Sequence, residues 1–137
     1  MKYLSPQWLF RYADAMKTTF SEKDAFIWQD EFGAAITVID RDYLILYMND
    51  KSIEANVRWG GKALLGHDVR ACHQERSVRI IEHILETGEP NVYTIEKQGV
   101  HKLIYQAPWR HNGVIAGVVE LSIEIPATMP HYVRDVQ

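Results

Sequence analysis

The dipeptide Asn112-Gly113 constrains the fold of this chain more than any other pair of residues. Both residue types tolerate positive φ, which the tight turn of a two-residue β-hairpin requires. Strand-forming sequence flanks the dipeptide on both sides, in residues 101–110 and 114–125. A third segment of this kind, residues 92–97, comes before them and is separated from them by a turn at Gln98-Gly99. The C-terminal part of the chain is therefore predicted to form three antiparallel strands.

Alternation along these strands predicts which side chains face the core. In the last strand the residues at odd positions are mostly apolar, whereas Glu120 and the even positions after it are polar, so the odd positions are expected to be buried. In the middle strand the residues at odd positions, which include Tyr105 and Trp109, are expected to face inward. Large aromatic side chains at such positions fill cores more often than they contact ligands. Both roles stay open for these two residues.

The rest of the chain supplies a second hairpin and several helices. Residues 34–49 are rich in β-branched and aromatic residues around a polar turn at Asp40. Asn49 follows and can cap a short helix. A longer amphipathic helix is expected to begin near Gln74 and to end at Gly88, because glycine favours the left-handed conformation that closes a helix. The predicted fold class is α+β, a five-stranded antiparallel sheet with helices on one face.

Residues 1–33 are predicted to be a helical N-terminal extension, residues 34–125 the domain itself, and residues 126–137 a C-terminal tail. Ser5 and Pro6 form a typical helix start. The helix that follows has an apolar stripe at spacings of three and four residues, made of Trp8, Leu9, Tyr12 and Met16. This stripe is the candidate dimer interface, with packing on the chain's own sheet as the alternative.

Composition limits the class of protein. With 137 residues and a net charge of -3, the chain is expected to form one domain without a nucleic-acid partner, because it has no cluster of Lys and Arg. Its apolar runs are far shorter than the roughly 20 residues that span a bilayer. The N-terminus also lacks the pattern of a signal peptide, and the single cysteine, Cys72, cannot form an intramolecular disulfide. A cytoplasmic protein without a membrane segment is therefore expected.

Several motifs resemble a PAS domain. Residues 35–42 and 45–50 look like the opening hairpin of that family, in which an Asp-centred turn joins two strands and the second strand ends in Asn. Leu64-Leu65-Gly66 resembles the family's Leu-Gly turn. Cys72-His73, with Ser77 four residues later, resembles the PAS subgroup that is often found beside hemerythrin-like domains. That subgroup usually carries proline where this chain has Gln74.

The resemblance implies a sensory or regulatory module in signal transduction. Such a module binds a small molecule, a protein partner, or both, and a helical N-terminal extension in this family often serves in pairing. A homodimer or a complex with a signalling protein is thus expected from the resemblance.

The candidate ligand-binding residues are His73, Ser77, Tyr105 and Trp109. On a helix that begins near His73, this histidine and Ser77 fall on the same face as the isoleucines that follow. A neutral imidazole that faces an apolar pocket can bind a small ligand or coordinate haem iron. It can equally bond a backbone carbonyl and fix the preceding loop.

Three functions remain open at this point: a ligand-sensing module, a haem sensor with His73 as the axial ligand, and a ligand-free dimerisation scaffold. A metal site other than haem is not expected, because the other His and Asp residues lack the paired spacing of zinc modules. An enzyme is not expected either, since the chain has no nucleophile elbow, phosphate loop or dinucleotide fingerprint. The sequence leaves the ligand and any cofactor unnamed.

Overall fold

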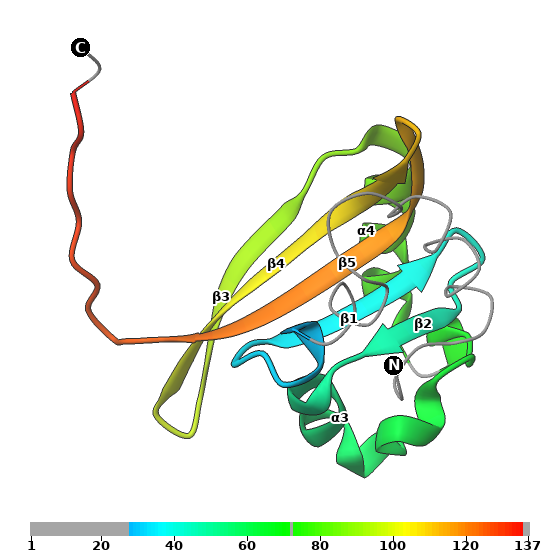
Figure 1. The fold of residues 1–137 in the computed structure, drawn as a ribbon, viewed down its shortest axis with the longest axis horizontal. Helices are drawn as coiled ribbons and strands as arrows, with labels where there is room; N and C mark the ends of the chain where they lie inside the picture. The colour runs from blue at the N-terminus through cyan, green and yellow to red at the C-terminus, as the bar shows by residue number, and fades with distance from the viewer. Residues whose placement is uncertain (1–27, 72, 136–137) are drawn as a thin grey trace.

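A computed structural model of the protein describes residues 28–71 and 73–135. Its five strands form one antiparallel sheet in the order β2-β1-β5-β4-β3 (Figure 1). In chain order the elements are β1 (Ala35–Asp40), β2 (Ile45–Met48), α3 (Asp50–Ala55), the short 3-10 helices η1 (Val57–Trp59), η2 (Gly61–Leu64) and η3 (Val69–Ala71), α4 (Glu75–Thr87), β3 (Asn91–Lys97), β4 (Val100–His111) and β5 (Val114–Ile125). The predicted α+β class and the five-stranded antiparallel sheet are confirmed.

The ends of the long helix also lie where the sequence places them. Gln74 is the N-cap of α4, and Gly88 is its C-cap with a φ of 76°. The predicted dimer stripe of Trp8, Leu9, Tyr12 and Met16 lies outside the described residues. Residues 126–135, which belong to the predicted tail, form neither helix nor strand.

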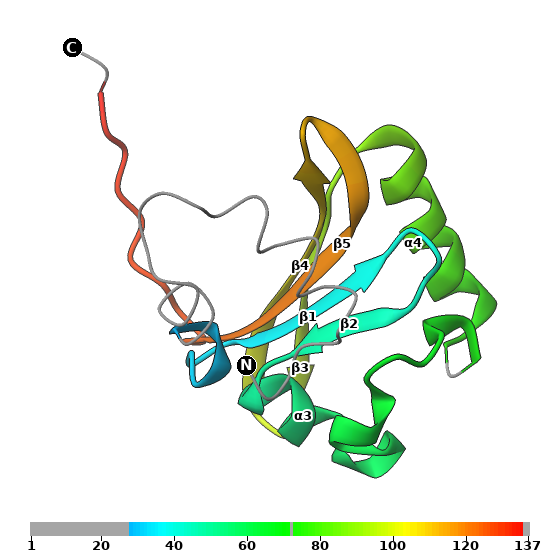
Figure 2. The same ribbon diagram turned by 45° about the vertical axis from the view of Figure 1, so that its right-hand side comes forward.

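The helices cover one face of the sheet. Helix α4 packs on β4 and β5, and α3 packs on β1 and β2 (Figure 2). Between them lies an apolar cluster whose buried members are Ile39, Ile45, Met48, Val69, Ile81, Ile84, Leu85 and Val118. A second apolar cluster, on the opposite face of the sheet, comprises Ile36, Val38, Leu46 and Tyr47, with Trp109, Val119 and Leu121 packed against it. We call the two sides of the sheet the helix face and the outer face.

A β-bulge in β5 decides which residues share a face. Trp109 pairs with Gly117 and Arg110 pairs with Ile115, which leaves Ala116 as the extra residue. An extra residue changes the phase of the alternation along the strand. Beyond the bulge, the even-numbered residues of β5 therefore point to the helix face and the odd-numbered residues point to the outer face.

The expectation that Tyr105 and Trp109 lie beneath the long helix is wrong, because the helices cover the face of the even-numbered residues of β4 and these two odd-numbered residues lie on the outer face. Trp109 packs in the outer-face cluster, and its Nε1 donates a hydrogen bond to the carbonyl oxygen of Ile39 at 2.9 Å. Gly117 has no room for a side chain, because an added Cβ would clash with the carbonyl oxygen of Ile39 and would lie 2.5 Å from Trp109 Nε1. Tyr105 shares this face and is 39% exposed.

Asn49 joins the first hairpin to α3. Its side chain is completely buried, and its Oδ1 accepts hydrogen bonds from the backbone N–H of Ile36 at 2.9 Å and of Ser52 at 3.0 Å. Its Nδ2 donates to the carbonyl oxygens of Ala34 at 2.7 Å and Gln29 at 3.1 Å. The predicted helix cap is confirmed, and the same amide also fixes the start of β1.

Candidate functional site

A cavity of about 220 Å³ lies between the helix face of the sheet and the helical layer. Its apolar walls are formed by Ile39, Ile45, Met48, Leu64, Val69, Ile81 and Val118. Six further residues with polar atoms complete the lining, namely Thr37, Asn56, Trp59, His73, Gln106 and Glu120. An apolar pocket with a few converging polar groups is the usual form of a small-molecule site.

A row of three polar side chains runs across the sheet, and two of them, Gln106 and Glu120, form the floor of this cavity. Asn91, Gln106 and Glu120 lie side by side on β3, β4 and β5, because they occupy paired positions in the register. Asn91 Nδ2 donates to Gln106 Oε1 at 2.8 Å, and Gln106 Nε2 donates to Glu120 Oε2 at 2.6 Å. The side-chain amides of Asn91 and Gln106 are therefore oriented by these hydrogen bonds, and the last acceptor in the row is the carboxylate of Glu120. A hydrogen bond to an ionised acceptor is short and strong, which fixes the rotamer of Glu120.

The row continues into β1 through Thr37, which pairs with Glu120. Thr37 Oγ1 and Ser52 Oγ lie 2.5 Å apart and share a hydrogen bond between β1 and α3. Asn56 Nδ2 donates to the carbonyl oxygen of Ser52 at 2.8 Å. The polar side chains at this end of the cavity are thus anchored to α3.

Charge on the row affects a neighbouring phenol. Tyr93 lies on β3 with its side chain on the helix face, opposite Ile104 of β4. Burial raises the pKa of Tyr93, and the nearby Glu120 carboxylate raises this pKa further. Glu120 therefore acts on groups beyond its immediate hydrogen-bond partner.

The wall that carries His73 is attached to the start of β2. Gly66 N donates to Ile45 O at 2.7 Å, Ile45 N donates to His67 O at 3.0 Å, and Val69 N donates to Tyr43 O at 2.9 Å. These bonds hold residues 66–69 beside the first hairpin almost as an additional strand. Val69 is thereby brought into the cavity wall.

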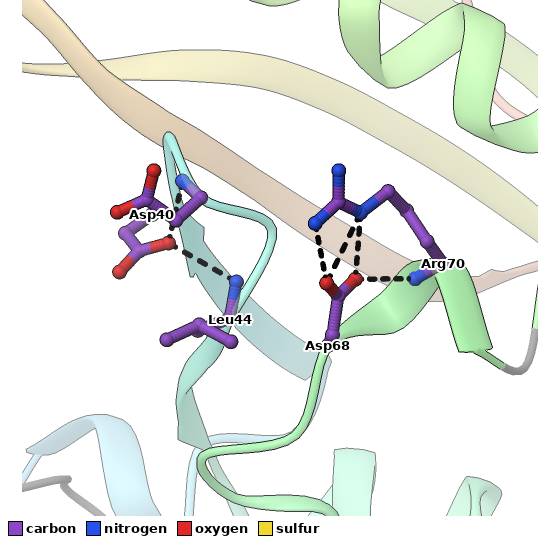
Figure 3. A network of polar contacts seen from close by, with 5 residues as sticks. Asp40, Leu44, Asp68 and Arg70 are labelled. Carbon is purple, nitrogen blue, oxygen red and sulfur yellow. Dashed lines mark hydrogen bonds and ion pairs between the residues drawn. The ribbon is translucent and has the colours of Figure 1, made fainter.

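Two carboxylates, Asp40 and Asp68, hold the turns at the two ends of this segment through hydrogen bonds (Figure 3). Asp40 Oδ1 accepts from Leu44 N at 3.0 Å, which shapes the predicted Asp-centred turn. Asp68 Oδ2 accepts from Arg70 Nη2 at 2.6 Å, and these hydrogen bonds with Arg70 lower the pKa of Asp68. The Arg70 guanidinium also lies over the Tyr43 ring, 4.6 Å from its centroid.

Of the four residues that the sequence suggested for the site, His73 is the one that lines the cavity. It precedes the N-cap of α4 and so is not on the helix, and its side chain lies at the exposed rim. His73 Nδ1 lies 3.0 Å from the carbonyl oxygen of Val69. The histidine thus holds the preceding loop in place, which was the structural alternative for this residue.

Ser77, Tyr105 and Trp109 do not line the cavity. Ser77 is half-buried in the first turn of α4, and the residue of α4 that reaches the cavity is Ile81. The two aromatic residues lie on the outer face, as described above. Their contact with a ligand in this cavity is therefore not supported by the geometry.

Sequence reasoning missed the polar floor. Gln106 and Glu120 were assigned to a solvated face, because the odd-numbered residues of β4 and β5 were taken to face the helices, whereas the helices cover the face of the even-numbered residues. The sequence offers a weak signal, a polar residue on each side of the Asn112-Gly113 turn, but Gln106 and Glu120 face each other only because of the bulge. Asn56 lies between α3 and η1, and Trp59 ends η1, where the helices are too short for periodicity to give a signal.

Within residues 28–71 and 73–135, no group of three or more His, Cys, Asp and Glu side chains is placed to hold a metal ion. In the same part of the chain, no helix is long and apolar enough to cross a membrane.

Solved structures with a similar fold include domains of sensor proteins. A sensory box sensor histidine kinase from Vibrio cholerae matches with a TM-score of 0.55 and 17% identity, over 84% of this chain and 98% of that one. The PAS domain of a protein from Colwellia psychrerythraea matches with a TM-score of 0.53 and 20% identity, over 75% and 95% of the two chains. The Aer2 receptor from Vibrio cholerae, described as a dual PAS-heme oxygen sensor, matches with a TM-score of 0.52 and 15% identity, over 68% and 95%.

Comparison with sequences gives the family. No curated protein matches the chain. The family model described as PAS fold matches residues 30–128, which is well over half of the chain. The chain therefore belongs to the PAS fold family.

Proposed function

We propose that this module binds a small molecule in the cavity between α4 and the sheet, and that it acts by recognition rather than by catalysis. One observation carries the proposal. The cavity combines apolar walls with a polar floor whose side chains are already held in place by one another. Polar groups that are oriented before binding lower the entropic cost of recognition.

The size of the cavity limits what can enter. Sites for drug-sized ligands usually measure about 300–1,000 Å³, whereas this cavity measures about 220 Å³. The occupant is therefore smaller than a typical drug molecule.

A haem does not fit this site, although His73 was a candidate axial ligand. The macrocycle is larger than a drug-sized ligand and would have to displace both the α4 wall at Ile81 and the polar row that includes Glu120. His73 lies at the rim and contacts Val69 O through Nδ1. An absorption spectrum of the purified protein without a Soret band, before and after incubation with haem, is the expected result.

Binding can change the helical layer because the cavity wall includes Ile81 of α4 and Val69 of the preceding loop. A ligand shifts a conformational equilibrium only by its difference in affinity for the two states. A ligand that contacts both the sheet and α4 would differ in its affinity for the two states, because any movement of α4 relative to β5 changes the shape of the cavity.

The signal would leave through a partner that contacts the outer face of the sheet, with a second copy of this chain as the first candidate. Exposed apolar side chains on the outer face include Val92 at 49% and Tyr105 at 39%. The stripe of Trp8, Leu9, Tyr12 and Met16 outside the described residues is the second part of this candidate interface. Light scattering of Trp8→Glu and Tyr105→Glu variants tests it, and dimer masses equal to that of the parent chain would remove both surfaces from the interface.

A cavity-filling variant tests ligand binding. Val118 is buried in the cavity wall, so Val118→Phe fills part of the space, whereas the matched control Val92→Phe makes the same change on the outer face. We expect mass spectrometry of denatured protein to release a small molecule from the parent chain and from Val92→Phe, but not from Val118→Phe. The proposal fails if the parent chain releases nothing and if fragments added to labelled protein leave the NMR signals of cavity residues unchanged.

A further inference from the structure

Glu120 sets the electrostatic character of the cavity. Among the described residues that line it, Glu120 is the sole carboxylate, and none is Lys or Arg. The neutral amide of Gln106 donates a hydrogen bond to Oε2 of this carboxylate. Its charge is therefore not balanced by a cationic side chain within the cavity.

The other polar groups of the lining mostly accept hydrogen bonds. Asn56 uses its Nδ2 to donate to Ser52 O, which leaves its Oδ1 as an acceptor. Gln106 accepts from Asn91 through Oε1 and donates to Glu120 through Nε2. Each amide nitrogen in the row thus uses one of its two N–H groups within the protein, whereas most of the acceptor capacity of Glu120 remains, because an ionised carboxylate accepts about four hydrogen bonds.

The mouth of the cavity adds an aromatic surface. Trp59 lines the cavity and is 58% exposed. Arg58 already lies over the indole, with its guanidinium 4.8 Å from the ring centroid, so this ring accepts a cation in the present structure. Indole rings are the strongest partners for cations among aromatic side chains.

We infer that the occupant of the cavity is a small organic cation, a protonated amine or amidine on an apolar body, whose N–H groups donate to Glu120. This inference rests on the proposed ligand-binding function and specifies the chemical class of the ligand. The apolar body lies against the isoleucine and valine side chains of the wall. The cation supplies the positive charge that the lining lacks, which makes the pairing with Glu120 favourable and disfavours anions by repulsion.

Three probes that differ only in their functional group test the inference. Benzylamine, benzyl alcohol and benzoate are titrated into isotope-labelled protein, and the NMR signals of cavity residues such as Ile81 and Val118 are followed. We expect benzylamine to bind at least about 10-fold more tightly than benzoate, with benzyl alcohol between them, because charge-assisted hydrogen bonds are about twice as strong as neutral ones.

A matched pair of variants identifies the residue. Glu120→Gln removes the carboxylate from the cavity floor, whereas Glu124→Gln makes the same change four residues along β5, on the same face but outside this cavity. We expect Glu120→Gln to weaken benzylamine binding at least about 10-fold and Glu124→Gln to leave it within about 2-fold. Urea unfolding of both variants checks that they remain folded.

The outcomes separate the two proposals. Binding of benzoate or benzyl alcohol as tight as that of benzylamine, or an unchanged benzylamine affinity in Glu120→Gln, overturns the cation inference and leaves a ligand-binding cavity. A folded protein whose cavity signals respond to none of the three probes, and which releases no small molecule on denaturation, overturns both.

Discussion

Replacing Asn49 with alanine is expected to destabilise the protein more than any other single polar substitution at the junction of β2 and α3. The amide is fully buried, and its loss would leave five backbone groups without their present partner: the N–H groups of Ile36 and Ser52 and the carbonyl oxygens of Ala34, Gln29 and Phe32. A stranded buried group costs about 1–3 kcal/mol, and a lost helix cap alone costs about 1 kcal/mol. Since neighbouring losses are not additive, we expect the free energy of unfolding to fall by about 3–5 kcal/mol.

Such a loss is a large fraction of the total, because domains of this size are stable by about 5–15 kcal/mol. Urea unfolding followed by circular dichroism measures it by linear extrapolation. The matched control is Asn56→Ala, which removes one hydrogen bond, from Nδ2 to Ser52 O, and is expected to cost about 1 kcal/mol. A loss for Asn49→Ala no larger than that of the control would refute the reasoning that this amide supports both β1 and α3.

The variant Asn49→Asp separates the two halves of the Asn49 network. It keeps acceptor oxygens for Ile36 N and Ser52 N but places an oxygen where Nδ2 now lies 2.7 Å from Ala34 O. Because the protonated carboxyl can donate at that position, its pKa in the folded state should be raised above the unfolded value. Stability of this variant, relative to the parent chain, should therefore be highest at low pH and be lost as the pH rises through the folded-state pKa.

Two further predictions concern the sheet. Gly117→Ala places a methyl group against the carbonyl oxygen of Ile39 and the Trp109 indole, which are joined by a hydrogen bond. We expect the free energy of unfolding to fall by about 2–4 kcal/mol through overpacking and the loss of this hydrogen bond, with altered tryptophan fluorescence. The control Gly33→Ala, whose added Cβ would meet nothing within 4 Å, should cost less than about 0.5 kcal/mol, and equal costs for the two variants would contradict the contact. Burial and the Glu120 carboxylate both raise the pKa of Tyr93. Glu120→Gln should therefore lower this pKa toward its ordinary value, which an ultraviolet titration of the phenol measures. An unchanged titration would show that the two groups do not interact.

The raised pKa of Tyr93 also makes the free energy of unfolding depend on pH. The folded state retains the phenolic proton to a higher pH than the unfolded state does. The stabilising contribution is therefore complete below the ordinary tyrosine pKa of about 10 and is lost as the pH rises through the folded-state value.

Local signals predicted the elements of the fold well. The Asn112-Gly113 turn, the caps of α4 at Gln74 and Gly88, and the cap of α3 at Asn49 lie where their side-chain and backbone chemistry requires. Each depends on residues close together in the chain, and so can be inferred without knowledge of tertiary contacts.

The site could not be predicted to the same extent, because it depends on which face of the sheet the helices cover. Both faces of β1 are apolar, with Val38 in the outer-face cluster and Ile39 in the helix-face cluster. Alternation therefore separates two faces without identifying either one. Counting outward from the turn without a bulge also pairs Gln106 with Val119, whereas the true partner is Glu120.

His73 illustrates a different limit. The spacing of His73 and Ser77 suggests one helical face, but the helix begins only after the N-cap at Gln74. Helix boundaries derived from sequence are uncertain by a few residues, and a shift of two residues is enough to move a side chain from the interior of a helix to a loop.

The bulge at Ala116 also has a consequence for how this chain can vary in length. Removing Ala116 would convert the bulge into a regular pair and leave every later residue of β5 opposite its present partner. Removing a residue nearer the middle of the strand, such as Val119, would instead exchange the two faces of one flank, and Glu120 or Leu121 would change sides. Position 116 is thus a place where a relative of this chain can lose one residue and keep the same cavity floor.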